Sequence, residues 1–359
     1  MAERYFLPGT DFRIRPEWRR PARPVFARAR ALAPGRLHFN VWDFSKMAPV
    51  VPGGGGLGCS TSAALSEIEV TAEGDGVEAP VPTAAHLARL MAEMVGYEGG
   101  LRISVPDRIA HVHSGYGSNV TFNTGVVAAV NALFGTPFSL AEMWDILTQN
   151  FVENADERHV YWGLDTGVGE SCLLYGGLVW VDEHARHVGH ADLDGIWVVT
   201  AAGDKAALAN ARLRALGQTT SRGVGDEEEK ELLAIECQKY QAEFGERHTA
   251  FVERRLKPFL LRNDARGLLR LGWELNEIGT YQVLLAYWEP EILEASVRAA
   301  REAGSLYAMM SSAGPSLFAL AEGRAAAERV RDALEGRFSG YFSSFAVGKA
   351  GVRLTVEVE

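Results

Sequence analysis

Cysteine and lysine are scarce in this chain. Its 359 residues include three cysteines, at positions 59, 172 and 237, and none of them forms a C-x-x-C pair. Such wide spacing argues against a disulfide framework or a cysteine zinc site and favours a reducing, cytoplasmic setting. Only six of the 36 basic residues are lysines. We interpret this excess of arginine as a trait of a GC-rich bacterial genome rather than as a functional demand.

Long apolar runs and a surplus of positive charge are also missing. No hydrophobic stretch approaches the roughly 20 residues of a membrane-spanning helix, and the N-terminal residues lack the apolar core of a signal peptide. The net charge is −10, which disfavours nonspecific binding to nucleic acid. The content of 47% hydrophobic and 23% charged residues is that of an ordinary soluble protein. We therefore expect small-molecule partners, with no membrane and no nucleic acid among them.

The pattern of apolar residues divides the chain into an arm and two domains. Residues 1–24 are rich in Arg, Pro and Trp, and we expect an arm that packs on the body or on a partner subunit, with a disordered tail as the alternative. Residues 25–200 mix strand-like runs with amphipathic helices, whereas helical periodicity dominates residues 201–359. The predicted fold class is α+β, with mixed sheets flanked by helices in two domains. Helices are predicted at about 118–134 and near 227–244, 247–262, 264–279, 290–303 and 323–336. A capping box at Ser139 and Glu142 predicts the start of one more helix.

A glycine loop runs directly into an apolar helix between His111 and Asn131, HVHSGYGSNVTFNTGVVAAVN. Glycine lets backbone N–H groups crowd around an oxyanion, and the N-terminus of the following helix adds a partial positive charge. The segment therefore predicts a phosphate cradle. It is not a Walker loop, because no Gly-Lys-Ser/Thr follows, and it is not a Rossmann fingerprint, because no strand ends directly before a G-x-G-x-x-G. A plain turn before a core helix is the alternative.

The candidate phosphate ligands in this loop are backbone amides and the hydroxyls of Ser118 and Thr121. His113 shares a strand face with His111. A metal pair is one interpretation, although no third ligand is visible, and we favour a hydrogen bond from His113 to phosphate. The predicted contacts are His113, Ser114, Gly115, Tyr116, Gly117, Ser118, Asn119 and Thr121.

Two earlier segments offer a bound ligand a cation and a backbone that can approach it closely. Arg36 and His38 alternate on one face of an expected strand, so Arg36 is predicted to grip a phosphate or carboxylate and His38 to donate to the same group. A structural salt bridge is the alternative for Arg36. Five glycines lie within residues 53–58. Gly54 and Gly55 are predicted to let the backbone approach a ligand closely, and a flexible hairpin tip is the alternative.

An acidic element follows in the middle of the chain, at Asp165, Thr166, Gly167 and Glu170. If pyrophosphate binds, Mg²⁺ should bridge it to a carboxylate, because magnesium prefers oxygen ligands. Asp165 and Glu170 are the candidate ligands. Capping of a helix by Asp165 is the alternative interpretation.

Two further segments complete the candidate site. Tyr161 and Trp162 precede the acidic element and are predicted to stack on the flat ring of an acceptor, with core packing as the alternative. Near the C-terminus, residues 311–315 read Ser-Ser-Ala-Gly-Pro between two strand-like runs. By itself this turn predicts a simple hairpin.

In this order the segments resemble the GHMP kinase superfamily. Within it they look most like β-ribofuranosylaminobenzene 5′-phosphate synthase and its C-nucleoside-forming relatives from formycin and pyrazofurin biosynthesis. R-L-H-F at 36–39 looks like that branch's first-strand motif, and H-S-G-Y-G-S at 113–118 looks like its H-x-G-L-G-S loop. D-T-G-V-G at 165–169, with the Y-G-G-L-V-W-V-D that follows, looks like its T-S-G-I-G…GG-F-I-V-D segment, and S-S-A-G-P looks like its S-S-x-G-P turn. Val120 and the GGGGLGCS run depart from the pattern.

The resemblance implies a GHMP-kinase-like two-domain fold and a C-ribosyltransferase that uses 5-phosphoribosyl 1-pyrophosphate (PRPP) and Mg²⁺. Pyrophosphate would leave C1′, an amino-substituted aromatic acid would attack through the ring carbon that bears its carboxylate, and loss of CO2 would restore aromaticity. The acceptor would be a pyrazole dicarboxylate of antibiotic biosynthesis, which the departures favour, or else 4-aminobenzoate. The resemblance also implies a homodimer and no redox cofactor. Catalytic roles would fall to His38, Asp165 and Glu170, and the C-terminal turn would contact the phosphates through Ser312, Ala313 and Gly314.

Two other functions remain open from the sequence. A GHMP-type small-molecule kinase would use the same loops to hold ATP, although Arg36 stands in the first-strand motif where no lysine is present. A phosphometabolite sensor on the same fold would bind its ligand without turning it over. Acceptor-dependent formation of ADP would identify the kinase, and binding without release of pyrophosphate would identify the sensor.

Overall fold

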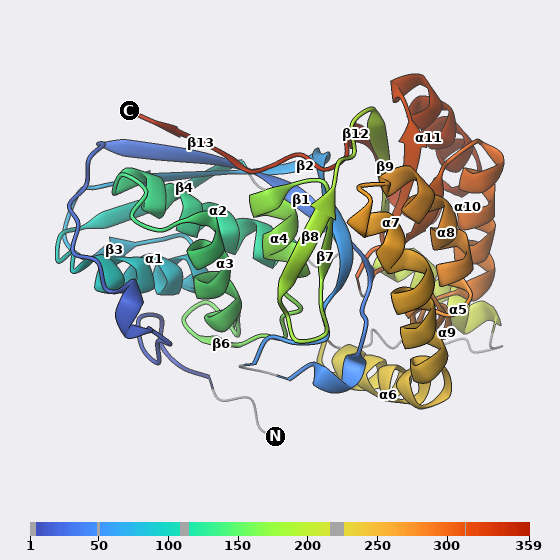
Figure 1. Cartoon of the computed structure of the whole chain (residues 1–359), viewed down its shortest axis with the longest axis horizontal. Helices are drawn as coiled ribbons and strands as arrows, with labels where there is room; N and C mark the ends of the chain where they lie inside the picture. The colour runs from blue at the N-terminus through green and yellow to red at the C-terminus, as the bar shows by residue number, and fades with distance from the viewer. Residues whose placement is uncertain (1–4, 49–50, 108–114, 216–225, 313) are drawn as a thin grey trace.

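Two sheets with helices packed on them form the molecule, one in each half of the chain (Figure 1). The computed structural model describes residues 5–48, 51–107, 115–215, 226–312 and 314–359. The predicted α+β class, with mixed sheets flanked by helices, is confirmed. None of the helices in these residues is long and apolar enough to cross a membrane.

The larger sheet is centred on two long antiparallel strands, β1 (Arg28–Asn40) and β2 (Gly56–Thr71). The strand order is β13 (Thr355–Val358), β1, β2, β4 (Leu101–Asp107) and β3 (Val77–Glu78), and β2 also pairs with β7 (Leu178–Val181), which pairs with β8 (His187–Ala191). Every one of these ladders is antiparallel except that of β3 and β4. The first and the last described parts of the chain thus share one sheet.

Four helices pack against this sheet: α1 (Pro82–Val95), α2 (Ser118–Leu133), α3 (Leu140–Gln149) and α4 (Val168–Tyr175). α2 is buried along almost its whole length, as expected for a helix that is apolar on every side and lies between a sheet and other helices. The predicted bounds of this helix and the capping box at Ser139 and Glu142 are confirmed. The N-terminus of α2 is therefore fixed in space by a buried helix.

The smaller sheet has the strand order β10 (Tyr307–Met310), β11 (Leu317–Glu322), β9 (Ile196–Gly203) and β12 (Phe342–Lys349). The helices of this half are α5 (Lys205–Ala215), α6 (Asp226–Phe251), α7 (Lys257–Leu261), α8 (Ala265–Asn276), α9 (Thr280–Tyr287), α10 (Pro290–Glu302) and α11 (Arg324–Phe338). The predicted break near residue 245 is wrong, because α6 continues through Gly245 and ends in a π-helical turn, Val252–Leu256. Glycine lowers helix propensity by about 1 kcal/mol but keeps its backbone donor, so it does not by itself end a helix.

The N-terminal arm packs on the body of its own chain. Phe6 exchanges two backbone hydrogen bonds of 3.0 Å with Val160, in the short hairpin of β5 (Val152–Asn154) and β6 (Val160–Trp162). Trp18, in a 3₁₀ turn (Pro16–Trp18), is 1% exposed. The division of the body at residue 200 stays a prediction. Residue 200 itself lies inside β9, and β13 returns to the first sheet.

Candidate active site

Ser311 joins three segments that are far apart in the sequence. Its hydroxyl donates to the carbonyl of Gly115 at 2.6 Å and accepts from the backbone N–H of His38 at 3.1 Å. The next residue, Ser312, donates its backbone N–H to the carbonyl of His38 at 3.1 Å. Ser311 is fully buried. The first-strand motif, the glycine loop and the C-terminal turn therefore meet at one place.

The glycine loop ends at the N-terminus of α2. Gly117 caps the helix with φ of 63°, and a Cβ at this position would lie 2.7 Å from Nε of Arg36. The backbone N–H of Arg36 donates to the carbonyl of Tyr116 at 2.8 Å. Only glycine suits residue 117, because a side chain there would be strained by the left-handed backbone and would clash with the guanidinium of Arg36.

Side chains of the loop are largely engaged elsewhere. Tyr116 is buried, which raises its pKa to about 12, and its hydroxyl interacts with Ser316 and Thr200 of the smaller sheet. Thr121 Oγ1 donates to the carbonyl of Pro34 at 3.1 Å. Ser118 is buried, and Asn119 Nδ2 lies 3.5 Å from Glu153 Oε1. The backbone amides of the loop are thus better placed for an anion than its hydroxyls, and the phosphate roles of these residues stay predictions. His113, Ser114 and His111 lie outside the described residues.

Arg36 reaches from β1 to the foot of this loop. Its Nε and Nη1 atoms are buried, and neither has a hydrogen-bond partner among the described residues. Burial lowers the pKa of Arg36, while Cys172, Glu170 and Asp165 raise it. Because an arginine stays protonated in proteins, this guanidinium is a buried cation with free donors. The structural salt bridge that was the alternative is not formed with any residue that the structure describes.

Asp165 and Glu170 face Arg36 from the N-terminal turn of α4. Asp165 Oδ1 accepts the backbone N–H of Gly167, the N-cap residue of α4, at 2.9 Å, whereas Oδ2 has no donor among the described residues, and capping by Asp165 stays an alternative. Within the part of the chain that the structure describes, both carboxyl oxygens of Glu170 also lack a donor, and Glu170 is fully buried. The hydroxyl of Thr166 accepts a long hydrogen bond of 3.4 Å from the N–H of Val168 in the same turn.

The two carboxyl groups titrate as neighbours. Burial raises the pKa of Asp165 to about 6, although the N–H of Gly167 and the charge of Arg36 lower it. Burial and then the Asp165 carboxylate raise the pKa of Glu170 well above its usual range. Two carboxyl groups hydrogen-bond only when one of them holds a proton. Burial therefore favours the protonated form of both carboxyl groups relative to their usual behaviour in water.

His38 lies on the same strand as Arg36 and is buried. Its Nε2 has no partner, and a Cβ on Gly56 would lie 2.6 Å from that atom. Burial and the charge of Arg36 lower the pKa of His38 to about 3, so the ring is neutral at pH 7. A neutral imidazole can hydrogen-bond a substrate group but adds no charge to the cradle.

The glycines of residues 53–56 pack against the protein's own backbone. A Cβ on Gly54 would lie 2.7 Å from Met47, and one on Gly55 would lie 2.0 Å from the carbonyl oxygen of Asp182. All four glycines are buried, and Gly53 donates its N–H to the carbonyl of Asp165 at 2.9 Å. This packing accounts for the run without a ligand, and a role for Gly54 and Gly55 in binding stays a prediction.

The C-terminal turn connects β10 to its antiparallel partner β11, as the hairpin interpretation expects. Ser312 has φ of 57°, and Gly314 donates its N–H to the carbonyl of Ser311 at 3.0 Å. Ala313 lies outside the described residues. The residue that ties this turn to the site is Ser311, the first serine of the motif, which the sequence reading quoted without giving it a role.

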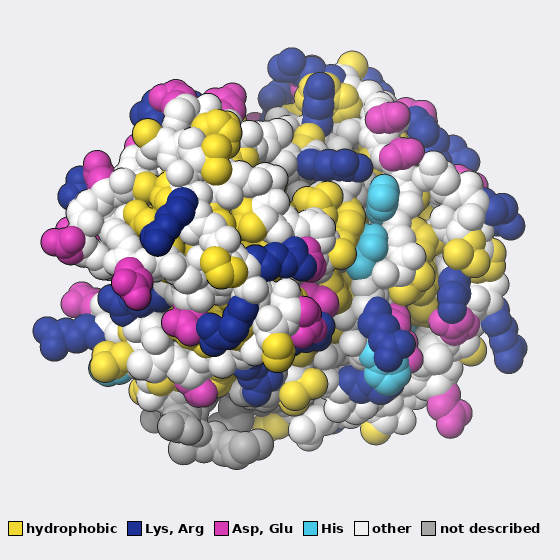
Figure 2. All heavy atoms as spheres, turned by 60° about the vertical axis from the view of Figure 1, so that its left-hand side comes forward, with side chains coloured by type: hydrophobic (Ala, Val, Ile, Leu, Met, Phe, Trp, Pro, Cys, Tyr) yellow, Lys and Arg dark blue, Asp and Glu magenta, His cyan; other side chains and the backbone are white. Residues whose placement is uncertain are grey.

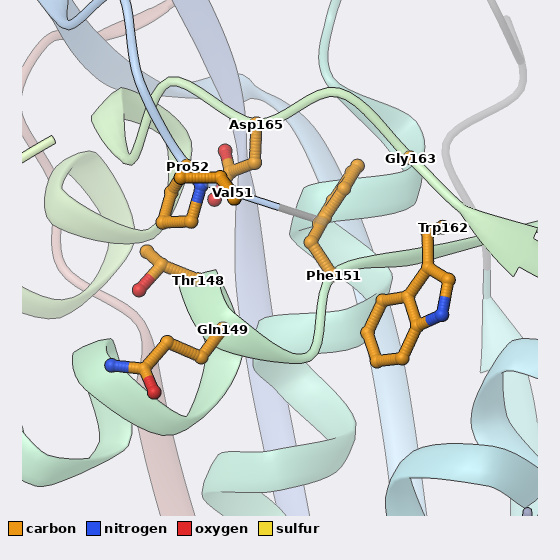
Figure 3. Close-up of a pocket in the computed structure, with 8 residues that line it drawn as sticks. All are labelled: Val51, Pro52, Thr148, Gln149, Phe151, Trp162, Gly163 and Asp165. Atoms are coloured by element: carbon orange, nitrogen blue, oxygen red, sulfur yellow. The ribbon is translucent and has the colours of Figure 1, made fainter. Parts of the chain in front are cut away.

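A narrow pocket opens beside Asp165 (Figure 3). It is too narrow to hold a water molecule and is lined by Val51, Pro52, Thr148, Gln149, Phe151, Trp162, Gly163 and Asp165. Trp162 lines this pocket, with its ring also near Phe6 at 5.4 Å and Arg13 at 5.0 Å. Tyr161 does not line it, because its hydroxyl donates to Glu153 and its ring is buried. Sequence reasoning missed Gln149 and Phe151, which belong to no motif.

The metal prediction rests on free carboxylate oxygens. Among the described residues there is no group of three or more His, Cys, Asp or Glu side chains able to hold a metal ion. The unpartnered oxygens of Asp165 and Glu170 have the chemistry that Mg²⁺ prefers. The phosphates of a substrate and water would have to complete its coordination.

Comparison with known proteins agrees with this architecture. Residues 262–340 match the family model described as GHMP kinases C terminal. No curated protein sequence matches the chain. Homoserine kinase from Cytophaga hutchinsonii is 15% identical with a TM-score of 0.62, over 93% of this chain and 99% of that one. Mevalonate kinase from L. major in complex with R-mevalonate is 14% identical with a TM-score of 0.60, over 91% and 98%.

The same fold is found outside the kinases. Mevalonate diphosphate decarboxylase from Staphylococcus aureus is 12% identical with a TM-score of 0.56, over 93% of this chain and 98% of that one. At these identities the similarity establishes the fold and leaves the activity open. The expected synthase-like branch has no support among these matches. The chain has the GHMP-kinase-like fold of these structures, and its residues 262–340 match the C-terminal domain of the GHMP kinases.

Proposed function

We propose that this chain is a GHMP-type small-molecule kinase that transfers a phosphoryl group from ATP to an acceptor hydroxyl, with Asp165 as the general base. The observation that carries the proposal is the placement of Arg36. Its free Nε lies against Gly117 at the N-terminus of α2, and the guanidinium faces Asp165 and Glu170 at the N-terminus of α4. Phosphoryl transfer requires this combination of positioning and charge stabilisation. The kinases that share the fold support the same assignment.

Each residue has a defined role in this proposal. The backbone amides at Gly115–Ser118 hold phosphate oxygens, and Arg36 donates to the phosphoryl group through Nε and Nη1. Asp165 Oδ2 accepts the proton of the acceptor hydroxyl, and a pKa of about 6 keeps this base ionised at pH 7. Glu170 supplies oxygen donors to Mg²⁺, which would neutralise charge on the transferred phosphates.

A second candidate is PRPP-dependent C-ribosylation with loss of CO2. The observation that favours it is the pair of aromatic side chains, Trp162 and Phe151, that line the narrow crevice beside Asp165, which would have to widen to admit a flat ring. The cradle at Arg36 would then hold pyrophosphate as the leaving group, and Asp165 and Glu170 would hold its Mg²⁺. The acceptor would be a pyrazole dicarboxylate or 4-aminobenzoate.

One set of assays separates the candidates. The protein is incubated with Mg²⁺ and ATP plus homoserine, mevalonate or other hydroxylated acceptors, and ADP is measured. In parallel it is incubated with Mg²⁺, PRPP and either 4-aminobenzoate or 4-aminopyrazole-3,5-dicarboxylate, and pyrophosphate and CO2 are measured together. Formation of ADP only when an acceptor is present would support the kinase. Equal release of pyrophosphate and CO2 would instead support the C-ribosyltransferase.

The Asp165→Asn variant is the matched control, because it keeps the shape of the side chain and the N–H contact of Gly167. We expect it to bind ATP with similar affinity while losing about 10²–10⁴-fold in turnover. Tight binding of ATP or PRPP by the wild-type protein with no product in either assay would contradict both activities and indicate a sensor.

A further inference from the structure

The crevice beside the proposed base has an aromatic wall, formed by Trp162 and Phe151. Trp162 packs against a small hydrophobic cluster that is separate from the two main cores and whose buried members are Phe6, Val152 and Val160. Val152 and Val160 belong to β5 and β6, which form a two-stranded sheet of their own. A two-stranded hairpin is at best marginally stable without further packing. The hairpin that carries Trp162 therefore depends on Phe6 of the N-terminal arm to complete its cluster.

Further contacts join the arm to Trp162. The guanidinium of Arg13 lies 5.0 Å from the ring centre of Trp162, whose indole N–H donates to Asp11 Oδ2 at 3.4 Å. The Phe6 ring lies 5.4 Å from the Trp162 ring and 5.6 Å from the ring of His86 in α1. Figure 1 shows the arm passing β6 and α1, and basic side chains lie directly against hydrophobic ones on the face that Figure 2 brings forward. The arm thus covers part of the Trp162 ring.

The arm also holds the end of α3, from which other lining residues come. The backbone N–H of Arg13 donates to Asn150 Oδ1 at 2.9 Å, and Asn150 Nδ2 donates to the carbonyl of Arg13 at 3.1 Å. Asn150 is fully buried and lies between Gln149 and Phe151, which both line the crevice. The carbonyl of Phe151 accepts the N–H of Gly163 at 3.1 Å. The same segment of the arm therefore supports both the α3 side and the hairpin side of the lining.

We propose that the N-terminal arm limits the size of the acceptor that reaches Asp165. Phe6 and Arg13 are the positioning residues, and they act through Trp162. The crevice is too narrow for a water molecule, so an acceptor can enter only if a wall moves. Figure 3 shows the Phe151 ring between Asp165 and Trp162. An aromatic wall that moves away from Asp165 must therefore displace the arm residues that pack against Trp162.

The lining indicates the class of acceptor. Asp165 is the one charged side chain among the described residues that line the crevice, and the apolar surface comes from Val51, Pro52, Phe151 and Trp162. We expect a slim alcohol, whose hydroxyl meets Asp165 and whose unbranched chain lies against the aromatic wall. This inference rests on the proposed function for the identity of the acceptor, whereas the support of the wall by the arm can be tested without any substrate.

Hydroxyl-radical footprinting of the full chain, read by mass spectrometry, measures the position of the wall. Phe151 is the reporter, because it is 8% exposed. Phe6→Ala leaves a void into which the surrounding side chains partly relax, so we expect the labelling of Phe151 to rise at least about threefold. Arg13→Ala removes the cation from the Trp162 ring and should raise the same labelling about two- to fivefold.

Each variant has a matched control in the arm. Leu7→Ala truncates the neighbour of Phe6, a side chain that is 58% exposed. Arg19→Ala removes the same charge as Arg13→Ala, from an exposed ion pair with Glu93 at 3.0 Å. Both controls should label Phe151 as the wild-type protein does. Circular dichroism checks folding, and Arg13→Ala remains informative if Phe6→Ala folds poorly, because it leaves the buried cluster intact.

The assay with ATP measures the consequence for specificity. Phe6→Ala should raise kcat/KM for the branched acceptor mevalonate relative to unbranched homoserine at least about fivefold, while the KM for ATP stays within about twofold. Phe6→Leu, which keeps most of the buried volume, should restore the wild-type ratio. A merely structural role for Phe6 would lower both kcat/KM values together.

The outcomes separate this inference from the proposed function. Wild-type labelling of Phe151 in both Phe6→Ala and Arg13→Ala would overturn the inference, and so would an equal rise in the controls. An unchanged ratio of the two acceptors alongside increased labelling would overturn it as well. If the wild-type protein forms no ADP with any acceptor, the proposed function fails, and the labelling alone then decides whether the arm holds the wall.

Discussion

The Glu170 carboxyl group lies beside the Asp165 carboxyl group at the start of α4, and burial raises the pKa of both. The arrangement concentrates a base, a cation and free donors in a space that excludes water. Paired carboxyl groups whose pKa values are raised by burial are a common feature of catalytic sites. Predictions about this pair can be tested before any substrate is known.

The Glu170→Gln variant tests where the proton is. Glutamine has the shape of a protonated glutamate and can also donate to Asp165. We therefore expect the free energy of unfolding at pH 7 to stay within about 1 kcal/mol of wild type, while Mg²⁺-dependent activity falls. Chemical denaturation measures the first quantity. A large gain in stability would show that wild-type Glu170 is ionised, because the substitution would then have removed a buried charge.

The pH dependence of stability reports on Asp165. Its pKa is raised by burial from 3.8 to about 6, so its folded form binds a proton more tightly than the unfolded chain does. The stabilising effect is present below about pH 4 and is lost as the pH rises through about 6. A shift of two pKa units corresponds to about 3 kcal/mol. Asp165→Asn should lack this slope, so the difference in unfolding free energy between wild type and variant should change across pH 4–6. Parallel profiles would contradict the raised pKa.

Gly117→Ala should be costly for two reasons. The left-handed backbone, with φ of 63°, costs about 1–2 kcal/mol for a residue with a Cβ, and the new Cβ would lie 2.7 Å from Nε of Arg36. Gly96→Ala is the matched control, because Gly96 has the same left-handed backbone, with φ of 59°, and nothing lies within 4 Å of the added Cβ. Gly323→Ala, where φ is 81°, is not comparable because its ψ of 154° is a different backbone region. Thermal unfolding should show a larger loss for Gly117→Ala, and its affinity for ATP should fall at least about tenfold. Equal losses in both variants would mean that Arg36 moves aside freely.

Ser311→Ala should loosen the junction of the three segments. It removes a buried hydroxyl that bonds both Gly115 and His38, and we expect a loss of about 1–3 kcal/mol with reduced affinity for phosphate ligands. The control is Ser296→Ala, a buried serine whose hydroxyl bonds only the Ile292 carbonyl of its own helix. Equilibrium unfolding of both variants, with ATP titration, makes the comparison. If Ser311→Ala binds ATP as tightly as the wild-type protein, the junction of the three segments does not contribute to ATP binding.

Local pattern alone determined much of the secondary structure. The glycine loop before an apolar run predicted α2 to within one residue, and the capping box at Ser139 and Glu142 began α3 as expected. These features follow from contacts within one helical turn, which depend only on neighbouring residues. The predicted break at Gly245 was wrong because a single glycine only weakens a helix.

Tertiary structure alone decided the site and its chemistry. Arg36, Gly117, Asp165 and Ser311 come together from positions spread over most of the chain, and no local pattern encodes that meeting. The glycines at 54 and 55 illustrate the same limit, since their close contacts are with Met47 and Asp182 of the protein itself. The free donors of Arg36 and the pKa of Asp165 depend on burial and on the distances between residues that are far apart in the sequence. Burial and these distances arise only once the chain has folded.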